Sequence, residues 1–170
     1  GATVSWMNEE TSEVGSVRLT PPEGISPVAF IPDFELRTAA ARAALPATVP
    51  HGDASFNVAR GALLAAVLSG NAQASGGADL HALLMEATRD RLHQEQRRAA
   101  MEPSLALVDW LRSAGFAAVV SGAGPTVLSL ESVGADIRRD AAGAGWRVVP
   151  LAVAVSGVQI TRGSLSKVEF

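Results

Sequence analysis

The sequence of 170 residues contains no cysteine. That absence excludes a disulfide framework, a thiolate zinc site and a cysteine nucleophile. It also fits a reducing compartment, and we expect the protein to be cytoplasmic. Lysine is almost as scarce, since Lys167 is the only one. Any contact to a phosphate or a nucleotide should therefore come from arginine or from backbone amides.

Long apolar runs and blocks of like charge are also missing. The apolar run at 62–68 covers about two helical turns, against the ~20 residues of a membrane span. The net charge is −3, and no block of basic residues stands out, which argues against a nucleic-acid-binding surface. We therefore expect neither a membrane nor a nucleic acid as a partner.

The remaining composition, with 48% apolar and 18% charged residues, is typical of a globular domain with a core. Apolar runs and turn residues predict strands at 2–7, 17–20, 28–32, 117–120, 127–130, 148–155 and 158–161. Helical spacing and capping signals predict helices at 38–45, 53–68, 79–91, 104–114 and 134–144. This order predicts an α+β fold, a two-layer sandwich with helices on one face of a mostly antiparallel sheet.

The most informative segment is a glycine-rich turn between the two strands predicted at 117–120 and 127–130, with the sequence Ser121-Gly122-Ala123-Gly124-Pro125-Thr126. Gly122 and Gly124 can adopt positive φ and bring their backbone N–H groups close to an anion. Ser121 and Thr126 supply hydroxyl groups. Because short glycine motifs are often plain turns, the segment indicates a ligand site only if other segments support it.

Two further segments could bind an anionic ligand. Thr38 and Arg42 are four residues apart, so on a helix they share one face, where a hydroxyl and a guanidinium suit a carboxylate or phosphate. The alternative is a capping threonine beside a solvated arginine. The charged segment 90–98 could supply a second arginine, or it could be a solvated helix end. His93 in this segment could act as a general base, although a surface or capping role is favoured.

A third segment, 53–60, is interpreted as structural. Asp53, Asn57 and Arg60 fall on one helical face, and Asp53 is the expected N-cap of that helix. Phe56 and Ala59 are expected to point inward. The sequence contains neither a Ser/His/Asp set nor a His-x-x-x-His metal motif.

Taken together, these segments resemble the C-terminal half of the homoserine kinases, a family of GHMP small-molecule kinases. The glycine motif alone indicates only the superfamily, whereas the Thr-x-x-x-Arg segment together with Leu-His-Gln-x-x-Arg is more specific. Glu95 and Gln96 stand where the family often has Pro-Tyr, which leaves Arg97 in register. The similar pieces occur in the family's order at residues 1–6, 31–42, 45–46, 53–60, 90–97 and 121–126.

The resemblance implies ATP-dependent phosphorylation of the side-chain hydroxyl of L-homoserine to O-phospho-L-homoserine, on the route to threonine. It implies a ferredoxin-like GHMP C-terminal domain at 26–170, preceded at 1–25 by the end of the N-terminal kinase domain. Thr38, Arg42 and Arg97 would line the homoserine pocket, with both arginines on the α-carboxylate. The loop near substrate and transferred phosphate would comprise Ser121, Gly122, Ala123, Gly124 and Thr126.

The family's ATP-cradling loop, the acidic residue near magnesium and the N-terminal homoserine contacts would all precede Gly1. No Gly-x-x-x-x-Gly-Lys-Ser/Thr loop replaces them. The chain also starts with glycine in place of methionine and enters a strand at once, so we expect a piece of a longer protein. The resemblance then implies that ATP and Mg²⁺ are bound mainly by the N-terminal half. It implies no catalytic residue or metal ligand in this chain, and no activity of the chain alone.

Two other functions remain open. Another GHMP kinase, such as diphosphocytidyl-methylerythritol kinase, would not require Arg42 or Arg97. A non-catalytic amino-acid-binding module is compatible with the same fold, because fold does not determine function. A glycine-rich Ser-Ser loop encoded upstream of Gly1 would favour the kinase, and a separate enzyme domain there would favour the module. Homodimerisation is left open as well.

Overall fold

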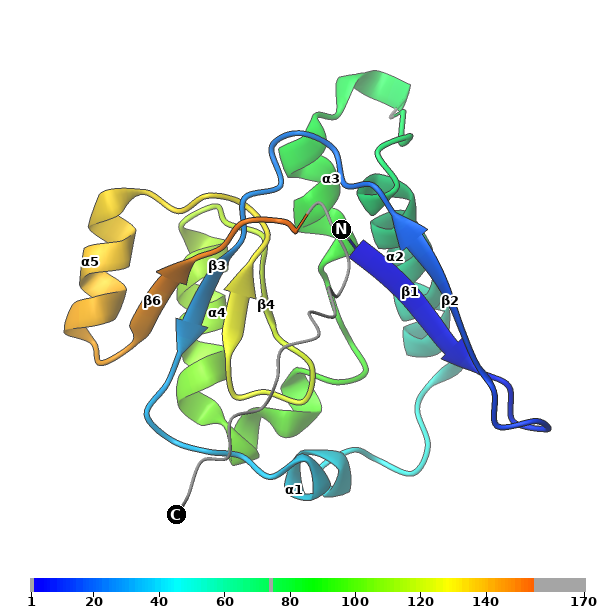
Figure 1. The fold of residues 1–170 in the computed structure, drawn as a ribbon. Coiled ribbons are helices and arrows are strands. Elements are labelled where there is room, and N and C mark those ends of the chain that lie inside the picture. Colours follow the sequence, from blue (N-terminus) through cyan, green and yellow to red (C-terminus); the bar gives the residue numbers. More distant parts are fainter. Residues whose placement is uncertain (1, 74, 155–170) are drawn as a thin grey trace, which may run out of the picture.

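The computed structural model of the chain describes residues 2–73 and 75–154 (Figure 1). Its main sheet has four antiparallel strands in the order β4-β5-β3-β6. The central strand β3 (Val28–Ile31) is the short apolar run, and its first three residues are buried. Its two edges are paired with β5 and β6. The other strands are β4 (Ala118–Val120), β5 (Val127–Ser129) and β6 (Arg147–Pro150).

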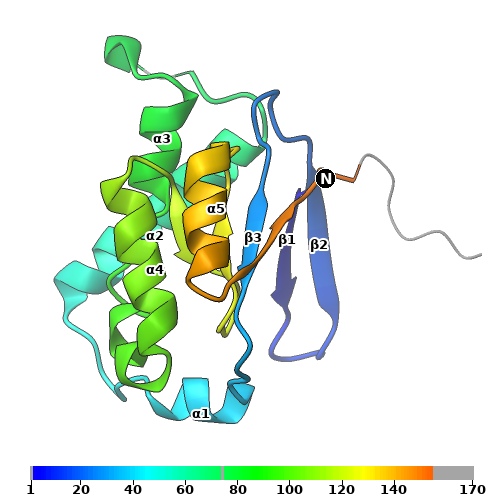
Figure 2. The same cartoon turned by 90° about the vertical axis from the view of Figure 1, so that its left-hand side faces the viewer.

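Four helices cover one side of this sheet, as Figure 2 shows. They are α2 (His51–Leu68), α3 (Leu80–Ala87), α4 (Glu102–Ser113) and α5 (Ala135–Gly143). The core between α4, α5 and the sheet includes Phe30, Leu111 and Val127, each fully buried. A second cluster joins α2 to α3 through Val67 and Leu84. The predicted α+β fold with helices on one face is confirmed.

A separate two-stranded sheet begins the described chain. It consists of β1 (Ala2–Met7) and β2 (Val14–Leu19), paired antiparallel. The Asn8 side chain closes the turn between them by accepting hydrogen bonds from the backbone N–H groups of Glu10 and Thr11. The hairpin was predicted, although β2 begins three residues before the expected Val17. The proposed domain division near residue 25 stays a prediction.

Three helix predictions need correction. Helix α2 begins at His51 after Pro50, so Asp53 lies in its first turn and is not its N-cap. In that position its negative charge still interacts favourably with the positive N-terminal end of the helix dipole. Ala59 was expected to point inward but is exposed. Helix α3 ends at Ala87, well before the expected Arg91, since the following residues turn around the carboxylate of Asp90.

The remaining differences are small. Strand β6 ends at Pro150 in place of the expected 155, which lies outside the described residues together with the strand predicted at 158–161. A short 3₁₀ turn, η1 (Ser75–Gly77), lies in the predicted loop at 71–77. Helix α1 (Thr38–Ala43) follows β3 and ends two residues before the expected position.

Candidate active site

The first candidate ligand residues lie on α1. Thr38 is the first residue of this helix and Arg42 lies in its last turn, so the two share a face as predicted. The N-cap position is taken by Arg37, and no side chain caps the helix. Both Thr38 and Arg42 are exposed to solvent. The structure therefore leaves both side chains accessible to a ligand.

Arg97 occupies a very different environment. It belongs to the 3₁₀ turn η2 (Glu95–Ala100), and only 9% of the residue is exposed. Its Nε donates to the carbonyl oxygen of Ala41 on α1 (3.1 Å), and its Nη1 donates to the carbonyl oxygen of Gly122 (3.4 Å). Nη2 donates to no acceptor among the residues that the structure describes. Arg97 thus connects α1 to the glycine loop, and one edge of its guanidinium remains available.

The neighbouring Arg98 shows what an ordinary arginine does in the same turn. Its guanidinium binds the carboxylates of Glu95 (2.7 Å) and Asp109 (3.0 Å). The hydrogen bonds that Arg98 donates to Glu95, together with the carboxylate of Asp109, hold the pKa of Arg98 above its ordinary value. By contrast, Arg97 forms no ion pair with any residue in 2–73 or 75–154. A nearly buried cation without a carboxylate partner is costly unless a ligand supplies the negative charge.

The glycine loop has the predicted backbone geometry. The φ angles of Gly122 and Gly124 are 62° and 88°, in the left-handed region. The Ser121 N–H donates to the Thr126 carbonyl (2.8 Å), and the Gly124 N–H donates to the Ser121 carbonyl (3.0 Å). Within the described chain, the amides of Gly122 and Ala123 have no acceptor. These two successive amides can therefore face an anion, whereas the Gly124 amide, which we had expected to do the same, is used inside the turn.

Segment 88–94, between α3 and η2, is held by a single carboxylate. Asp90 accepts hydrogen bonds from Asn57 Nδ2 (2.6 Å) and from the N–H groups of Gln94 (2.7 Å) and His93 (2.8 Å). Burial opposes its negative charge, but these donors outweigh burial and lower the pKa of Asp90 below its ordinary value. From the sequence alone, Arg97 and His93 are candidate functional residues, whereas no role is assigned to Asp90. An acidic residue three and four positions before His93 and Gln94 was the available signal.

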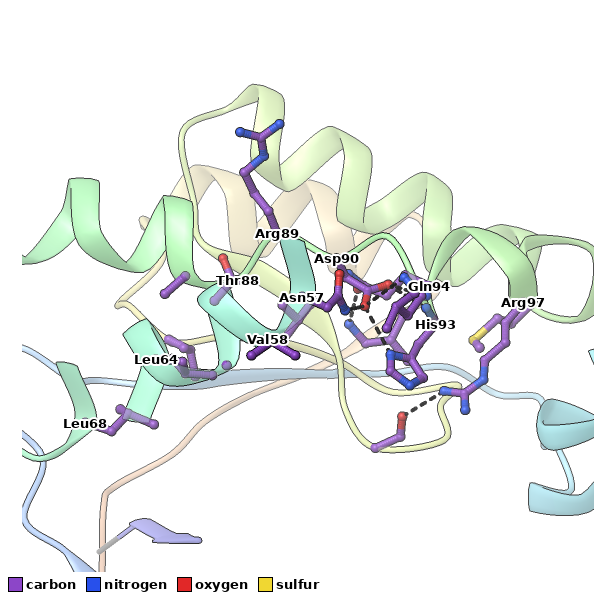
Figure 3. Close-up of a pocket in the computed structure, with 18 residues that line it drawn as sticks. Asn57, Val58, Leu64, Leu68, Thr88, Arg89, Asp90, His93, Gln94 and Arg97 are labelled. Carbon is purple, nitrogen blue, oxygen red and sulfur yellow. Dashed lines mark hydrogen bonds and ion pairs between the residues drawn. The ribbon is translucent and has the colours of Figure 1, made fainter. Parts of the chain in front are cut away.

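A cavity of about 680 Å³ lies between α2, this segment and the glycine loop (Figure 3). Arg97 and His93 lie toward one end, and Leu64 and Leu68 lie at the other end. Gly122, whose carbonyl accepts a hydrogen bond from Arg97, also lines the cavity. The Nδ1 atom of His93 is 3.1 Å from Oδ1 of Asp90, and about half of the His93 side chain is exposed. The structure thus brings His93 beside the candidate ligand groups, which the sequence had left open.

A second hollow of about 410 Å³ lies on the other flank of the glycine loop. It is lined by residues 31–37 together with Pro125 and Thr126. Thr38 and Arg42 line neither cavity, although α1 is in contact with Arg97 through Ala41. Of the predicted site residues, the structure therefore brings Arg97 and the glycine loop directly together and places α1 against them.

The polar face of α2 has the supporting role that was predicted. Arg60 pairs with Glu86, and Arg91 donates to Asp53 (3.4 Å). The guanidinium carbons of Arg60 and Arg91 lie 3.7 and 3.9 Å from the centre of the Phe56 ring, within the range of a cation–π contact. These contacts fasten α2 to the end of α3 and to the segment that follows it.

The described residues contain no group of three or more histidine, cysteine or acidic side chains placed to hold a metal ion. Across 2–73 and 75–154, none of the helices combines the length and apolar character needed to cross a membrane.

Comparison with known proteins identifies the relatives of this chain. Residues 63–141 match the family described as GHMP kinases C terminal. The chain therefore contains a GHMP kinase C-terminal domain. Over nearly its whole length it is similar to homoserine kinases, and it corresponds to their C-terminal half.

The chain is 42% identical over 161 residues to the homoserine kinase of Streptomyces avermitilis, covering 94% of this chain and 49% of that protein. It is 41% identical over 161 residues to the enzyme of Streptomyces coelicolor, covering 94% and 48%. The chain thus spans about half the length of these curated relatives. The crystal structure of homoserine kinase from Cytophaga hutchinsonii shares the fold, with a TM-score of 0.67 at 20% identity, over 82% of this chain and 45% of that one.

Proposed function

We propose that this chain is the C-terminal half of a kinase that transfers the γ-phosphoryl group of ATP to the side-chain hydroxyl of L-homoserine. In this proposal Arg97 binds the α-carboxylate of homoserine from the cavity. Arg42 and Thr38, exposed on α1, which contacts Arg97 through Ala41, approach the same substrate from that helix. The loop formed by Ser121, Gly122, Ala123, Gly124 and Thr126 lies near the reacting hydroxyl and the transferred phosphate. The kinase is proposed to be cytoplasmic.

The observation that carries the proposal is the state of Arg97. It is nearly buried, it is held by two carbonyl oxygens, and it forms no ion pair with any described residue. A carbonyl oxygen carries only a partial charge, so the guanidinium keeps most of its positive charge unneutralised. A substrate carboxylate is the planar anion that matches a free guanidinium edge.

The geometry suits phosphoryl transfer because this reaction depends on positioning and charge stabilisation. If the carboxylate end of the amino acid is fixed on Arg97, the other end of the molecule can reach the glycine loop, whose Gly122 carbonyl Arg97 already contacts. The unpaired amides of Gly122 and Ala123 can then donate to oxygens that carry developing negative charge. Holding the hydroxyl in line with the phosphate removes much of the entropic cost of the reaction.

ATP is a substrate of this reaction, and Mg²⁺ would neutralise charge on its phosphates when bound. Following the family resemblance, we assign both ligands mainly to an N-terminal half. By the full-length enzyme we mean the proposed kinase with this chain as its C-terminal half.

The test compares two adjacent arginines in the full-length enzyme. Arg97→Ala should raise the KM for homoserine by about ten- to a hundredfold, since a charge-assisted contact is worth on the order of 1.5–3 kcal/mol. The KM for ATP should change little. Arg98→Ala is the matched control, because Arg98 lies in the same turn but is already paired with Glu95 and Asp109. It should leave the KM for homoserine near the wild-type value.

Equal effects of the two substitutions would show that the turn matters only for folding. An unchanged KM for homoserine in Arg97→Ala would place the carboxylate elsewhere. Absence of any homoserine-dependent ADP formation by the wild-type full-length enzyme would refute the proposed function itself.

A further inference from the structure

The carboxylate of Asp90 is the centre of a hydrogen-bonded path that ends at Arg97. Only 14% of its side chain is exposed. One donor is Nδ2 of Asn57 (2.6 Å). Asn57 lies on α2, 33 positions before Asp90 in the sequence. The other short contacts come from the backbone N–H groups of His93 and Gln94. Asp90 therefore sets the conformation of the chain at Gln94 and fixes that point relative to α2.

The path continues from Gln94 in two directions. The Gln94 carbonyl accepts the N–H of Arg97 (3.0 Å), which begins the 3₁₀ turn. The Gln94 side chain accepts the N–H of Val120 (2.8 Å), at the end of β4 and just before the glycine loop. Gln94 therefore holds both the backbone of Arg97 and the start of the glycine loop.

From this path we infer that Asp90 is a positioning residue for substrate binding: acting through Gln94, it fixes the guanidinium of Arg97 relative to the carbonyl and amide of Gly122. The inference rests on the proposed function, because it assigns Arg97 to the substrate carboxylate. Asp90 itself makes no contact with Arg97 in the described chain, so its effect must pass through the backbone. The result is a rigid support from α2 for a site built from loops.

The substitution that tests this inference, Asp90→Asn, changes the side chain very little in size. In Asp90→Asn, one carboxylate oxygen is replaced by an NH₂ group, which can only donate. The three short contacts at Asp90 all come from donors, so the amide cannot accept all of them. At least one donor loses its partner, and the turn at Gln94 should relax. Volume and shape hardly change, so packing is preserved.

In the full-length enzyme, Asp90→Asn should raise the KM for homoserine about tenfold, the size expected when a buried hydrogen-bonded donor loses its acceptor. The KM for ATP should stay near the wild-type value. Asp109→Asn is the matched control. Asp109 binds Arg98 from the solvent side of the same turn (3.0 Å) and is 60% exposed, so its loss should leave the KM for homoserine unchanged.

A double-mutant cycle separates positioning from general stabilisation. If Asp90 acts through Arg97, adding Asp90→Asn to Arg97→Ala should cause little further increase in the KM for homoserine. Independent, multiplicative effects would overturn the inference. A lower melting temperature together with a wild-type KM for homoserine would also overturn it. If Asp90→Asn fails to fold, Asn57→Ala, which removes the α2 end of the path, takes its place with the same expected results.

The proposed function and the role of Asp90 can be refuted separately. A wild-type enzyme without homoserine phosphorylation, or an Arg97→Ala variant with normal KM, would refute the proposed function. An Arg97→Ala variant with raised KM beside an Asp90→Asn variant with normal KM would refute only the role of Asp90.

Discussion

Substituting the two loop glycines one at a time should separate function from stability. In sequence they look alike, and both have positive φ. A methyl group added at Gly122 would meet no heavy atom of the described residues within 4 Å. A methyl group added at Gly124 would lie 2.6 Å from Sδ of Met101 and 3.1 Å from Cγ1 of Val120. Met101 is only 1% exposed and cannot move into solvent without disturbing the core.

These contacts set the expected magnitudes. Left-handed backbone strain for alanine costs about 1–2 kcal/mol, and reduced freedom of the unfolded chain offsets part of it. Gly122→Ala should therefore lower the free energy of unfolding by about 1 kcal/mol or less. Gly124→Ala adds overpacking against Met101, worth about 1–3 kcal/mol. Its total loss should be about 1–4 kcal/mol.

Activity should follow the opposite order when it is expressed per folded molecule. Gly122→Ala places its methyl group in the open space beside Arg97 and shifts the unpaired amides of Gly122 and Ala123. We expect kcat/KM for homoserine to fall about tenfold or more, because a displacement of ~1 Å in a reacting group can cost on the order of 100-fold. Much of the loss caused by Gly124→Ala should be recovered after correction for the folded fraction.

The assay is urea unfolding and steady-state kinetics on the same preparation of the full-length enzyme. A Gly122→Ala variant with the wild-type rate per folded molecule would show that the loop is only a hairpin turn. Equal stability of the two variants would show instead that the packing of Gly124 against Met101 has been overestimated.

Three other predictions can be tested in parallel. The chain alone, mixed with ATP, Mg²⁺ and homoserine, should form no phosphohomoserine above a buffer blank, since the resemblance assigns the nucleotide contacts to an N-terminal half; measurable turnover would contradict this. Arg42→Ala should raise the KM for homoserine about tenfold while the KM for ATP stays normal, and Arg42→Lys should recover only part of the loss, because an ammonium cannot bind a carboxylate through two parallel hydrogen bonds; a normal KM in the alanine variant would remove Arg42 from the site. The difference in unfolding free energy between wild type and Asp90→Asn should be fully present at about pH 7. It should shrink as the pH falls below the ordinary Asp pKa of 3.8 toward the lowered pKa in the folded protein, because the donors around Asp90 stabilise only its ionised form. His93 faces the same carboxylate, and a difference that persists unchanged at about pH 3 in urea melts would disprove the charge assignment.

The order of strands and helices could be predicted from the sequence because the signals are local. The continuous apolar run of β3 and the apolar pairs beside the glycine turn form strands where expected. The left-handed angles of Gly122 and Gly124 follow from residue type. The boundaries that failed, at the start of α2 and the end of α3, depend on Pro50 at the N-cap and on the turn around Asp90. Both signals are local, but helical spacing alone does not reveal them.

The sequence by itself determined the α+β class, the glycine turn and the family resemblance, since each depends on residues close together in the chain. The resemblance singles out Arg97, but only the tertiary structure showed how its surroundings differ from those of Arg98, and how Gly122 differs from Gly124. The acceptor of Arg97 on α1 is 56 positions away in sequence, whereas Arg98 is paired with Glu95 three positions before it. Burial and pairing of that kind are decided by which distant segments pack together, and so the chemical difference between adjacent, identical side chains appears only in the folded chain.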